Sequence, residues 1–178
     1  MRVFVAFFAG ETDPWDRVVR WWTGSEFTHT ELVMPDAVSW IGISPFAGGT
    51  LSLKKRGSLT PETHLGGKWK YLAFDCTSAQ VERLRDFFTR TRGCSYDWVG
   101  MIASQLTPWR IKTPGKWYCS EWVAHALTFS GIIDPDTFSA MDRKDLSPGT
   151  IWSILRSEAS EVLDTLLNIK SSRELLNV

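Results

Sequence analysis

The segment WYCSEWVAHALTF, residues 117–129, has the apolar spacing of a helix that is buried along one side. Its apolar residues recur at i, i+3, i+4, i+7 and i+8, the period of an α-helix, and they are Cys119, Trp122, Val123, Ala126 and Leu127. Gly131 follows as a helix stop signal. We therefore predict a helix from about Tyr118 to Phe129, with Cys119 in its first turn at the tip of the buried stripe.

On either side of this segment, strand-like and helix-like patterns are separated by glycine and proline. The segments whose apolar alternation favours β-strands are 3–8, 27–34, 38–44, 50–53 and 69–75. The other segments whose apolar period and capping residues favour helices are 14–22, 78–92, 96–107 and one that begins at Ser147-Pro148. These patterns predict an α+β protein with a small antiparallel sheet flanked by helices.

The chain is expected to form one domain. Its 178 residues contain no internal repeat, low-complexity block or linker. Residues 1–157 are expected to form the domain itself. Residues 158–178 carry the apolar spacing of an amphipathic helix over 158–176. This helix is expected either to belong to the same domain or to act as a docking tail for a partner.

Composition excludes several classes of protein. The 20 Lys and Arg residues balance the 20 Asp and Glu residues, which argues against a nucleic-acid binder, and the basic run Lys54-Lys55-Arg56 is interpreted as a solvated loop. No apolar run approaches the ~18 residues of a transmembrane helix, so no integral membrane segment is expected. Residues 1–9 lack a signal-peptide cleavage site and are predicted to form a strand, so we expect a cytoplasmic protein at synthesis.

Cys119 is the candidate for covalent chemistry. The three cysteines, Cys76, Cys94 and Cys119, are odd in number and include no C-x-x-C pair, which favours free thiols in a reducing compartment. The N–H groups and dipole of a helix N-terminus stabilise a thiolate and lower a thiol pKa from about 8.5. The alternative is a packing role, because free cysteine is among the most buried residue types.

A nucleophilic thiol needs an imidazole as its base, and the sequence offers three histidines. His125 lies six positions after Cys119, on another side of the same helix, and His64 lies in a loop where exposure is expected. His29 lies in a predicted strand and projects to the same side as Glu31 at i+2. Glu31 would orient the imidazole, raise its basicity or hold a substrate ammonium group; alternatively, it is a solvent-facing charge on an edge strand.

Other catalytic chemistries lack the residues they need. The His-x-Glu pair and the three cysteines match no zinc-ligand spacing. The segment Asp134-Pro135-Asp136 lacks the glycine and spaced ligands of a calcium loop and is expected to be a turn. No serine stands in a G-x-S-x-G motif. We therefore expect neither a metal site nor a cofactor.

Four segments of the sequence together carry a resemblance to a known family. They are FTHTEL at 27–32, the glycine-containing segment 42–50, YDWVG at 96–100 and WYCSEWV at 117–123. Together they resemble the circularly permuted NlpC-type, papain-like cysteine peptidases and amidases. The histidine precedes the cysteine by 90 positions, which is the order of the permuted branch, and the resemblance covers about residues 1–130. It implies a permuted papain-like fold.

The resemblance also implies roles for individual residues. Cys119 would be the nucleophile, and His29 would be the general base and later the acid for the leaving group. The family usually has a third polar residue on the next strand, but VSWIGIS at 38–44 contains no His, Asn, Gln or acidic residue. Either Glu31 or a serine such as Ser44 would take this role, or the site would be a dyad.

Four further residues are expected to contact substrate or to support the site. Tyr96 and Asp97 would line the groove or brace the helix that carries Cys119, and Ser44 and Tyr118 would lie beside the reacting groups. The backbone N–H of Cys119 would contribute to an oxyanion hole.

Relatives of this architecture act on cell-wall peptides or transfer lipid acyl groups. The resemblance therefore implies hydrolysis of a peptide or peptidoglycan fragment, with a lipid-directed acyltransferase or thioesterase as an alternative. The compact domain is also similar to versions found in bacteriophage genomes. This similarity implies that the protein is carried in a virion, or that it binds a virion protein or another protein partner. A further alternative is a non-catalytic virion or interaction module that has kept the fold.

Overall fold

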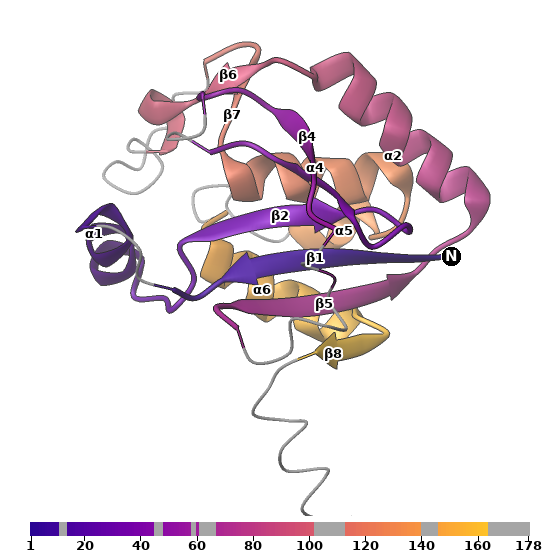
Figure 1. The fold of residues 1–178 in the computed structure, drawn as a ribbon, viewed down its shortest axis with the longest axis horizontal. Coiled ribbons are helices and arrows are strands. Elements are labelled where there is room, and N and C mark those ends of the chain that lie inside the picture. Colours follow the sequence, from indigo (N-terminus) through magenta and orange to yellow (C-terminus); the bar gives the residue numbers. More distant parts are fainter. Residues whose placement is uncertain are drawn as a thin grey trace, which may run out of the picture.

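The computed structural model describes residues 1–10, 14–44, 48–57, 60, 67–101, 113–139 and 146–163. These residues form a six-stranded sheet, in which every pair of neighbouring strands is antiparallel, with helices packed against it (Figure 1). The prediction of an α+β protein with a small antiparallel sheet is confirmed.

The strand that begins the chain lies inside the sheet. The order across the sheet is β4 (Ser52–Lys55), β3 (Ser39–Gly42), β2 (His29–Val33), β1 (Arg2–Phe8), β5 (Trp69–Asp75) and β8 (Glu161–Leu163). In the register of the two inner pairs, Ala6 of β1 lies opposite Glu31 of β2 and Tyr71 of β5. Because β2 is enclosed by β1 and β3, the interpretation of Glu31 as a solvent-facing charge on an edge strand is wrong.

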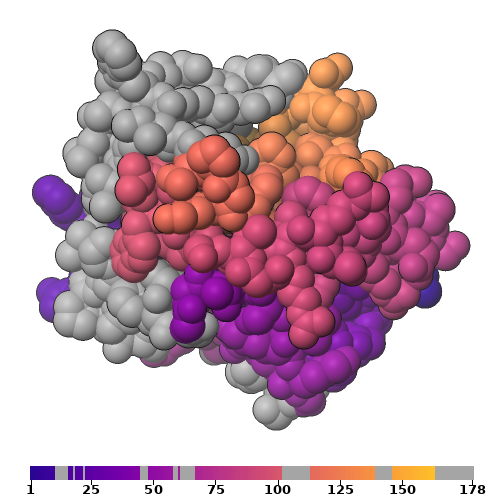
Figure 2. Space-filling view, turned by 90° about the horizontal axis from the view of Figure 1, so that it is seen from above, coloured from indigo at the N-terminus to yellow at the C-terminus, as the bar shows by residue number. Residues whose placement is uncertain are grey.

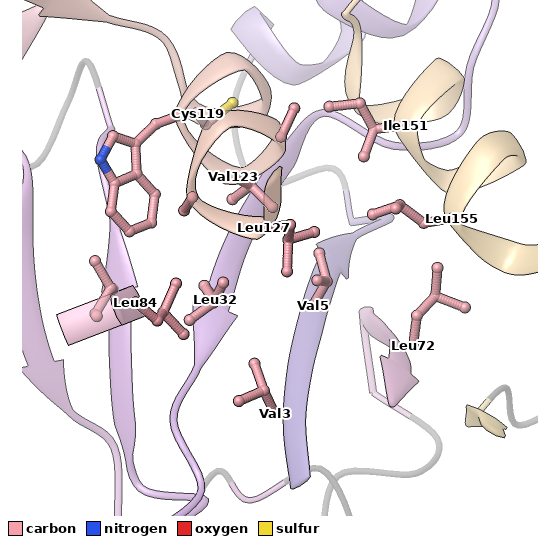
Figure 3. Packing of buried hydrophobic residues seen from close by; sticks show 14 of the residues in the cluster. Val3, Val5, Leu32, Leu72, Leu84, Cys119, Val123, Leu127, Ile151 and Leu155 are labelled. Carbon is pink, nitrogen blue, oxygen red and sulfur yellow. The ribbon is translucent and has the colours of Figure 1, made fainter. Parts of the chain in front are cut away.

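The two faces of the sheet carry separate apolar clusters, as the two-residue period of a strand requires. Val5, Leu32 and Leu72 face the helices and belong to the main core. Figure 3 shows them opposite Val123 and Leu127 of one helix and Ile151 and Leu155 of another. The alternate residues form a smaller cluster on the opposite face, made of Phe4, Ala6, Val33, Trp40, Tyr71 and Ala73, with Trp69 packed against it.

Local signals mark several ends of the named helices. They are α1 (Pro14–Thr23), α2 (Ser78–Thr91), α4 (Cys119–Ser130), α5 (Pro135–Ser139) and α6 (Pro148–Glu158). Thr77 opens α2 with a capping box, and Ser147 caps α6. Gly131 ends α4 at φ +70°, a left-handed conformation that glycine adopts without a steric penalty. Of the described helices, none combines the length and apolarity of a membrane span.

The segment after α2 ties three parts of the chain together. Strand β6 (Ser95–Tyr96) pairs in parallel with β7 (Lys116–Trp117), and Ser95 also bridges to Thr50. In the view of Figure 2, α2 and this segment lie between residues 48–57 and residues 113–139. The predicted helix from Tyr96 begins only after Asp97, at residue 98, because residues 95–96 are held by strand pairing.

Two further sequence predictions are wrong over described residues. The predicted helix from 158 includes β8 at Glu161–Leu163, which pairs with β5 and so satisfies backbone groups at the edge of that strand. Residues 164–178 lie outside the described residues. The expected turn at 134–136 is the start of α5, where the Asp134 side chain accepts the N–H of Asp136 at 2.9 Å.

Candidate active site

Helix α4 and strand β2 each begin with one of the two candidate catalytic residues. Cys119 is 6% exposed, and the side chain of His29 is 19% exposed. The two side chains interact by hydrogen bonding and by charge. Figure 3 shows the sulfur of Cys119 at one end of α4, beyond the packed residues Val123 and Leu127. The fold therefore brings together two side chains that are 90 positions apart in the sequence.

The first turn of α4 has the electrostatics expected around a thiolate. Burial by itself raises the pKa of Cys119, but hydrogen bonding and charge from His29 lower it, as do backbone hydrogen bonds from Thr30 and Ser120. The net result is a pKa below the ordinary thiol value. Tyr118 occupies the N-cap position without a side-chain capping bond, so no side-chain cap from this residue competes for the first-turn N–H groups.

The pKa of His29 moves in the opposite direction. Burial lowers it, but hydrogen bonds and charges from Cys119 and Glu31 raise it well above the ordinary value of 6.5. A lowered thiol pKa beside a raised imidazole pKa favours an ion pair between thiolate and imidazolium. Because the two groups titrate together, the protonation steps belong to the pair.

Glu31 lies directly behind the imidazole. Its Oε1 is 3.2 Å from Nε2 of His29, and the glutamate side chain is only 1% exposed. With Nε2 directed at Glu31, the second ring nitrogen, Nδ1, is the one available to the sulfur. Burial raises the pKa of Glu31, but His29, Arg56 and Lys54 together lower it to about 2. The carboxylate is therefore ionised throughout the physiological range.

Two cations from the end of β4 share this carboxylate. Arg56 Nη2 lies 3.1 Å from Oε1 and 3.0 Å from Oε2, and Lys54 Nζ lies 3.5 Å from Oε1. The interpretation of residues 54–56 as a solvated loop is therefore wrong for Lys54 and Arg56. Among the described residues, His29, Lys54 and Arg56 thus already contact the oxygens of the Glu31 carboxylate, which favours the orienting role over binding of a substrate ammonium group.

A glycine makes room for the buried carboxylate. A Cβ at Gly42 of β3 would lie 2.6 Å from Cγ of Glu31, closer than real carbon atoms approach. The apolar surroundings of the carboxylate come from the cluster on the face of the sheet opposite the main core, where Trp40 and Trp69 pack edge to face at 5.2 Å. The site thus depends on a missing side chain on the neighbouring strand.

Of the remaining predicted site residues, Tyr96 and Tyr118 lie close to Cys119. Tyr96 is buried and its pKa is raised by burial and by the charge of Cys119, so it lies near the thiol; its hydroxyl donates to Met101 Sδ at 3.1 Å. Tyr118 is buried at the N-cap of α4. Ser44 is partly exposed, two residues beyond the end of β3.

Asp97 has its carboxylate engaged within the chain. Its Oδ1 accepts the N–H of Gly100 at 2.9 Å and the hydroxyl of Thr113 at 3.0 Å, and its Oδ2 accepts the N–H of Thr113 at 3.2 Å. Its own N–H donates to Trp117 O at 2.9 Å. These bonds join the start of the helical turn 98–101 to the strand that leads into α4, which is a bracing arrangement.

Of the other two histidines, one lies within the described residues. The ring of His125 packs against that of Trp117 at 5.0 Å, and His64 lies outside the described residues. Sequence reasoning missed Arg56, Lys54 and Gly42. Two signals were present: cationic residues at the alternate positions 54 and 56, at the end of a strand-like run after Thr50, and a glycine inside the strand pattern 38–44.

No protein-family model matches the sequence, and no curated protein matches it.

Stability at low pH is expected to depend on Glu31. A carboxylate whose folded pKa is about 2, against 4.5 for the free group, stabilises the folded state above pH 4.5 and loses this contribution as the pH falls toward 2. The loss is on the order of 3 kcal/mol. Urea unfolding of the wild type and of Glu31→Gln, repeated from pH 6 to pH 2, measures this loss. The free energy of unfolding is expected to fall less steeply with decreasing pH in the variant than in the wild type.

Asp36→Asn is the matched control for this measurement. The pKa of Asp36 is also lowered to about 2, despite the opposing effect of burial, because Ser39, Lys55 and Val38 hydrogen-bond to its carboxylate. Its side chain is 46% exposed, so solvent screening makes its contribution smaller. If the free energy of unfolding fell equally with decreasing pH in the wild type and in Glu31→Gln, the prediction would be contradicted.

Proposed function

We propose that the protein is a cysteine hydrolase of the permuted papain-like fold, which cleaves amide bonds in peptides of the cell-wall type. The observation that carries the proposal is the arrangement of three side chains: Cys119 at the start of a helix, His29 beside it, and the Glu31 carboxylate 3.2 Å from the far ring nitrogen. This is the relation of nucleophile, base and orienting group that covalent catalysis requires. The order of histidine before cysteine supports the permuted form.

The arrangement supports a two-step reaction. The thiolate of Cys119 attacks the amide carbonyl, and the C=O π electrons move onto the oxygen. Backbone N–H groups of the first turn of α4, that of Cys119 among them, stabilise this oxyanion. The His29 imidazolium then donates its proton to the amide nitrogen; the oxyanion re-forms the C=O bond, the C–N bond breaks and the amine leaves, while the acyl group stays on Cys119 as a thioester. Neutral His29 next takes a proton from water as the water oxygen attacks the thioester carbonyl. The C–S bond then breaks, which releases the carboxylic acid and regenerates the thiolate–imidazolium pair.

The buried charges favour an enzyme over a non-catalytic module of the same fold. Removing Glu31 and its cations from water costs free energy, and replacement of a buried ion network by apolar residues is often neutral or stabilising. A module without turnover has no catalytic use for a buried carboxylate behind an imidazole. In an enzyme, the Glu31 carboxylate would fix the orientation of the base His29 and raise its proton affinity.

The proposal is tested by hydrolysis of defined peptidoglycan peptides, followed by mass spectrometry, with Cys119→Ala as the blank. The wild type is expected to release the fragments, and the variant to be slower by at least about a thousandfold. Short-chain thioesters are assayed in parallel. Turnover of thioesters alone would support the lipid-directed alternative, and no turnover of either class with an unreactive Cys119 would support the non-catalytic module.

A further inference from the structure

We propose that Arg56 is a positioning residue of this hydrolase: it fixes the Glu31 carboxylate against Nε2 of His29 and thereby orients the base toward Cys119. The proposal rests on the proposed function of the site. Arg56 lies immediately after β4 and acts on the reacting atoms only through Glu31 and His29.

The contacts of Arg56 determine where the carboxylate can lie. One nitrogen, Nη2, is within hydrogen-bond distance of both carboxylate oxygens, at 3.1 Å and 3.0 Å. The backbone N–H of Arg56 donates to Val38 O at 2.8 Å, so the base of the side chain is also held. The Arg56 side chain is 25% exposed, and a partly desolvated guanidinium binds a carboxylate more strongly than an exposed one.

Two indole rings hold the guanidinium in place. The guanidinium carbon lies 5.0 Å from the ring centroid of Trp40 and 5.6 Å from that of Trp69. Both distances are within the range of cation–π attraction. The ring of Trp69 is also 6.3 Å from that of His29. Trp40 and Trp69 therefore both contact Arg56, and Trp69 also contacts His29.

Glu31 needs such an anchor because the residues beside it on the adjacent strands have no side-chain donor for its carboxylate. The neighbouring residues across the sheet are Ala6 and Gly42, which are small and uncharged. The charged groups that face Glu31 are His29 from β2 and Lys54 and Arg56 from the β4 segment. Lys54 is the more distant cation, at 3.5 Å. Arg56 is thus the group that contacts both carboxylate oxygens.

Removal of Arg56 has opposite consequences under two explanations, which makes the role testable. If Arg56 acted only as a charge, its loss would leave more of the Glu31 charge for His29, stabilise the imidazolium and make Cys119 more reactive at low pH. If Arg56 positions Glu31, its loss lets the carboxylate leave Nε2, and the imidazolium and its thiolate partner become less stable. Cys119 is then less reactive at low pH.

The experiment measures alkylation of Cys119 by iodoacetamide from pH 5 to pH 9 in Arg56→Met, with Lys55→Met as control. Lys55 is the adjacent residue, carries the same charge and contacts Asp36 instead of Glu31. We expect Arg56→Met to lower the rate at pH 6.5 about tenfold and to shift the acid limb to higher pH. Lys55→Met is expected to leave the profile unchanged, and Arg56→Lys, which keeps the charge, to restore part of the rate.

A double-mutant cycle separates positioning from general destabilisation. In a Glu31→Gln background, Arg56→Met is expected to cause no further loss of alkylation rate, because the group it positions has lost its charge. Additive losses, or a faster reaction in Arg56→Met alone, would overturn the proposal. An unreactive Cys119 in the wild type would contradict the proposed function itself, whereas a reactive wild type with Arg56→Met equal to Lys55→Met would contradict only the role of Arg56.

Discussion

Iodoacetamide at pH 6.5 is expected to alkylate Cys119 at least about a hundredfold faster than Cys76 or Cys94, because only the thiolate reacts. The neighbourhood of Cys119 lowers its pKa, whereas burial raises the pKa of Cys76, whose thiol donates to Phe74 O at 3.2 Å. His29→Ala removes the imidazolium and leaves the burial, so it is expected to abolish most of this difference. Mass spectrometry of the labelled peptides gives the three rates.

His125→Ala is the control for loss of a histidine from the same region. Its ring packs on Trp117 and takes no part in the pair of Cys119 and His29, so the rate at Cys119 is expected to stay unchanged. Similar rates at all three cysteines, or a rate at Cys119 that does not respond to His29→Ala, would leave Cys119 as a packing residue.

Gly42→Ala is expected to reduce turnover at least about tenfold and to destabilise the fold by ~1–3 kcal/mol, the usual cost of overpacking. The added Cβ would lie 2.6 Å from Cγ, 2.9 Å from Cδ and 3.0 Å from Oε1 of Glu31. Glu31 is enclosed by β1 and β3, so it can give way only by leaving His29. Steady-state hydrolysis and thermal unfolding measure the two effects.

Gly57→Ala is the matched control, because a Cβ at Gly57 meets nothing within 4 Å. It is expected to retain wild-type turnover and stability. If Gly42→Ala and Gly57→Ala had the same turnover and stability, the close fit between β3 and the Glu31 carboxylate would not matter for function.

The parts of the site that sequence reasoning predicted depend on local periodicity. The apolar stripe after Cys119 has a helical period, and all five of its residues are buried on α4. The pairing of His29 with Glu31 follows from the two-residue repeat of a strand, and the structure places these side chains 3.2 Å apart. Each of these inferences needs only a few neighbouring residues.

The parts that were missed depend on contacts between distant segments. The cationic character of residues 54–56 gives no sign that Arg56 meets a carboxylate 25 positions earlier, since the same residues also suit a solvated loop. The tail after Glu158 has helical spacing, yet residues 161–163 pair with β5 because that strand offers an edge. Tertiary pairing overrides a local pattern in both cases.

The distance along the chain between Cys119 and His29 has a consequence during synthesis. Strand β2 leaves the ribosome long before α4, and until α4 docks on β2 the sulfur lacks both the imidazole and the N–H of Thr30. A nascent or partly unfolded chain therefore carries an ordinary cysteine. The lowered thiol pKa therefore arises from folding itself, and any local opening that separates α4 from β2 is expected to return it toward the ordinary value.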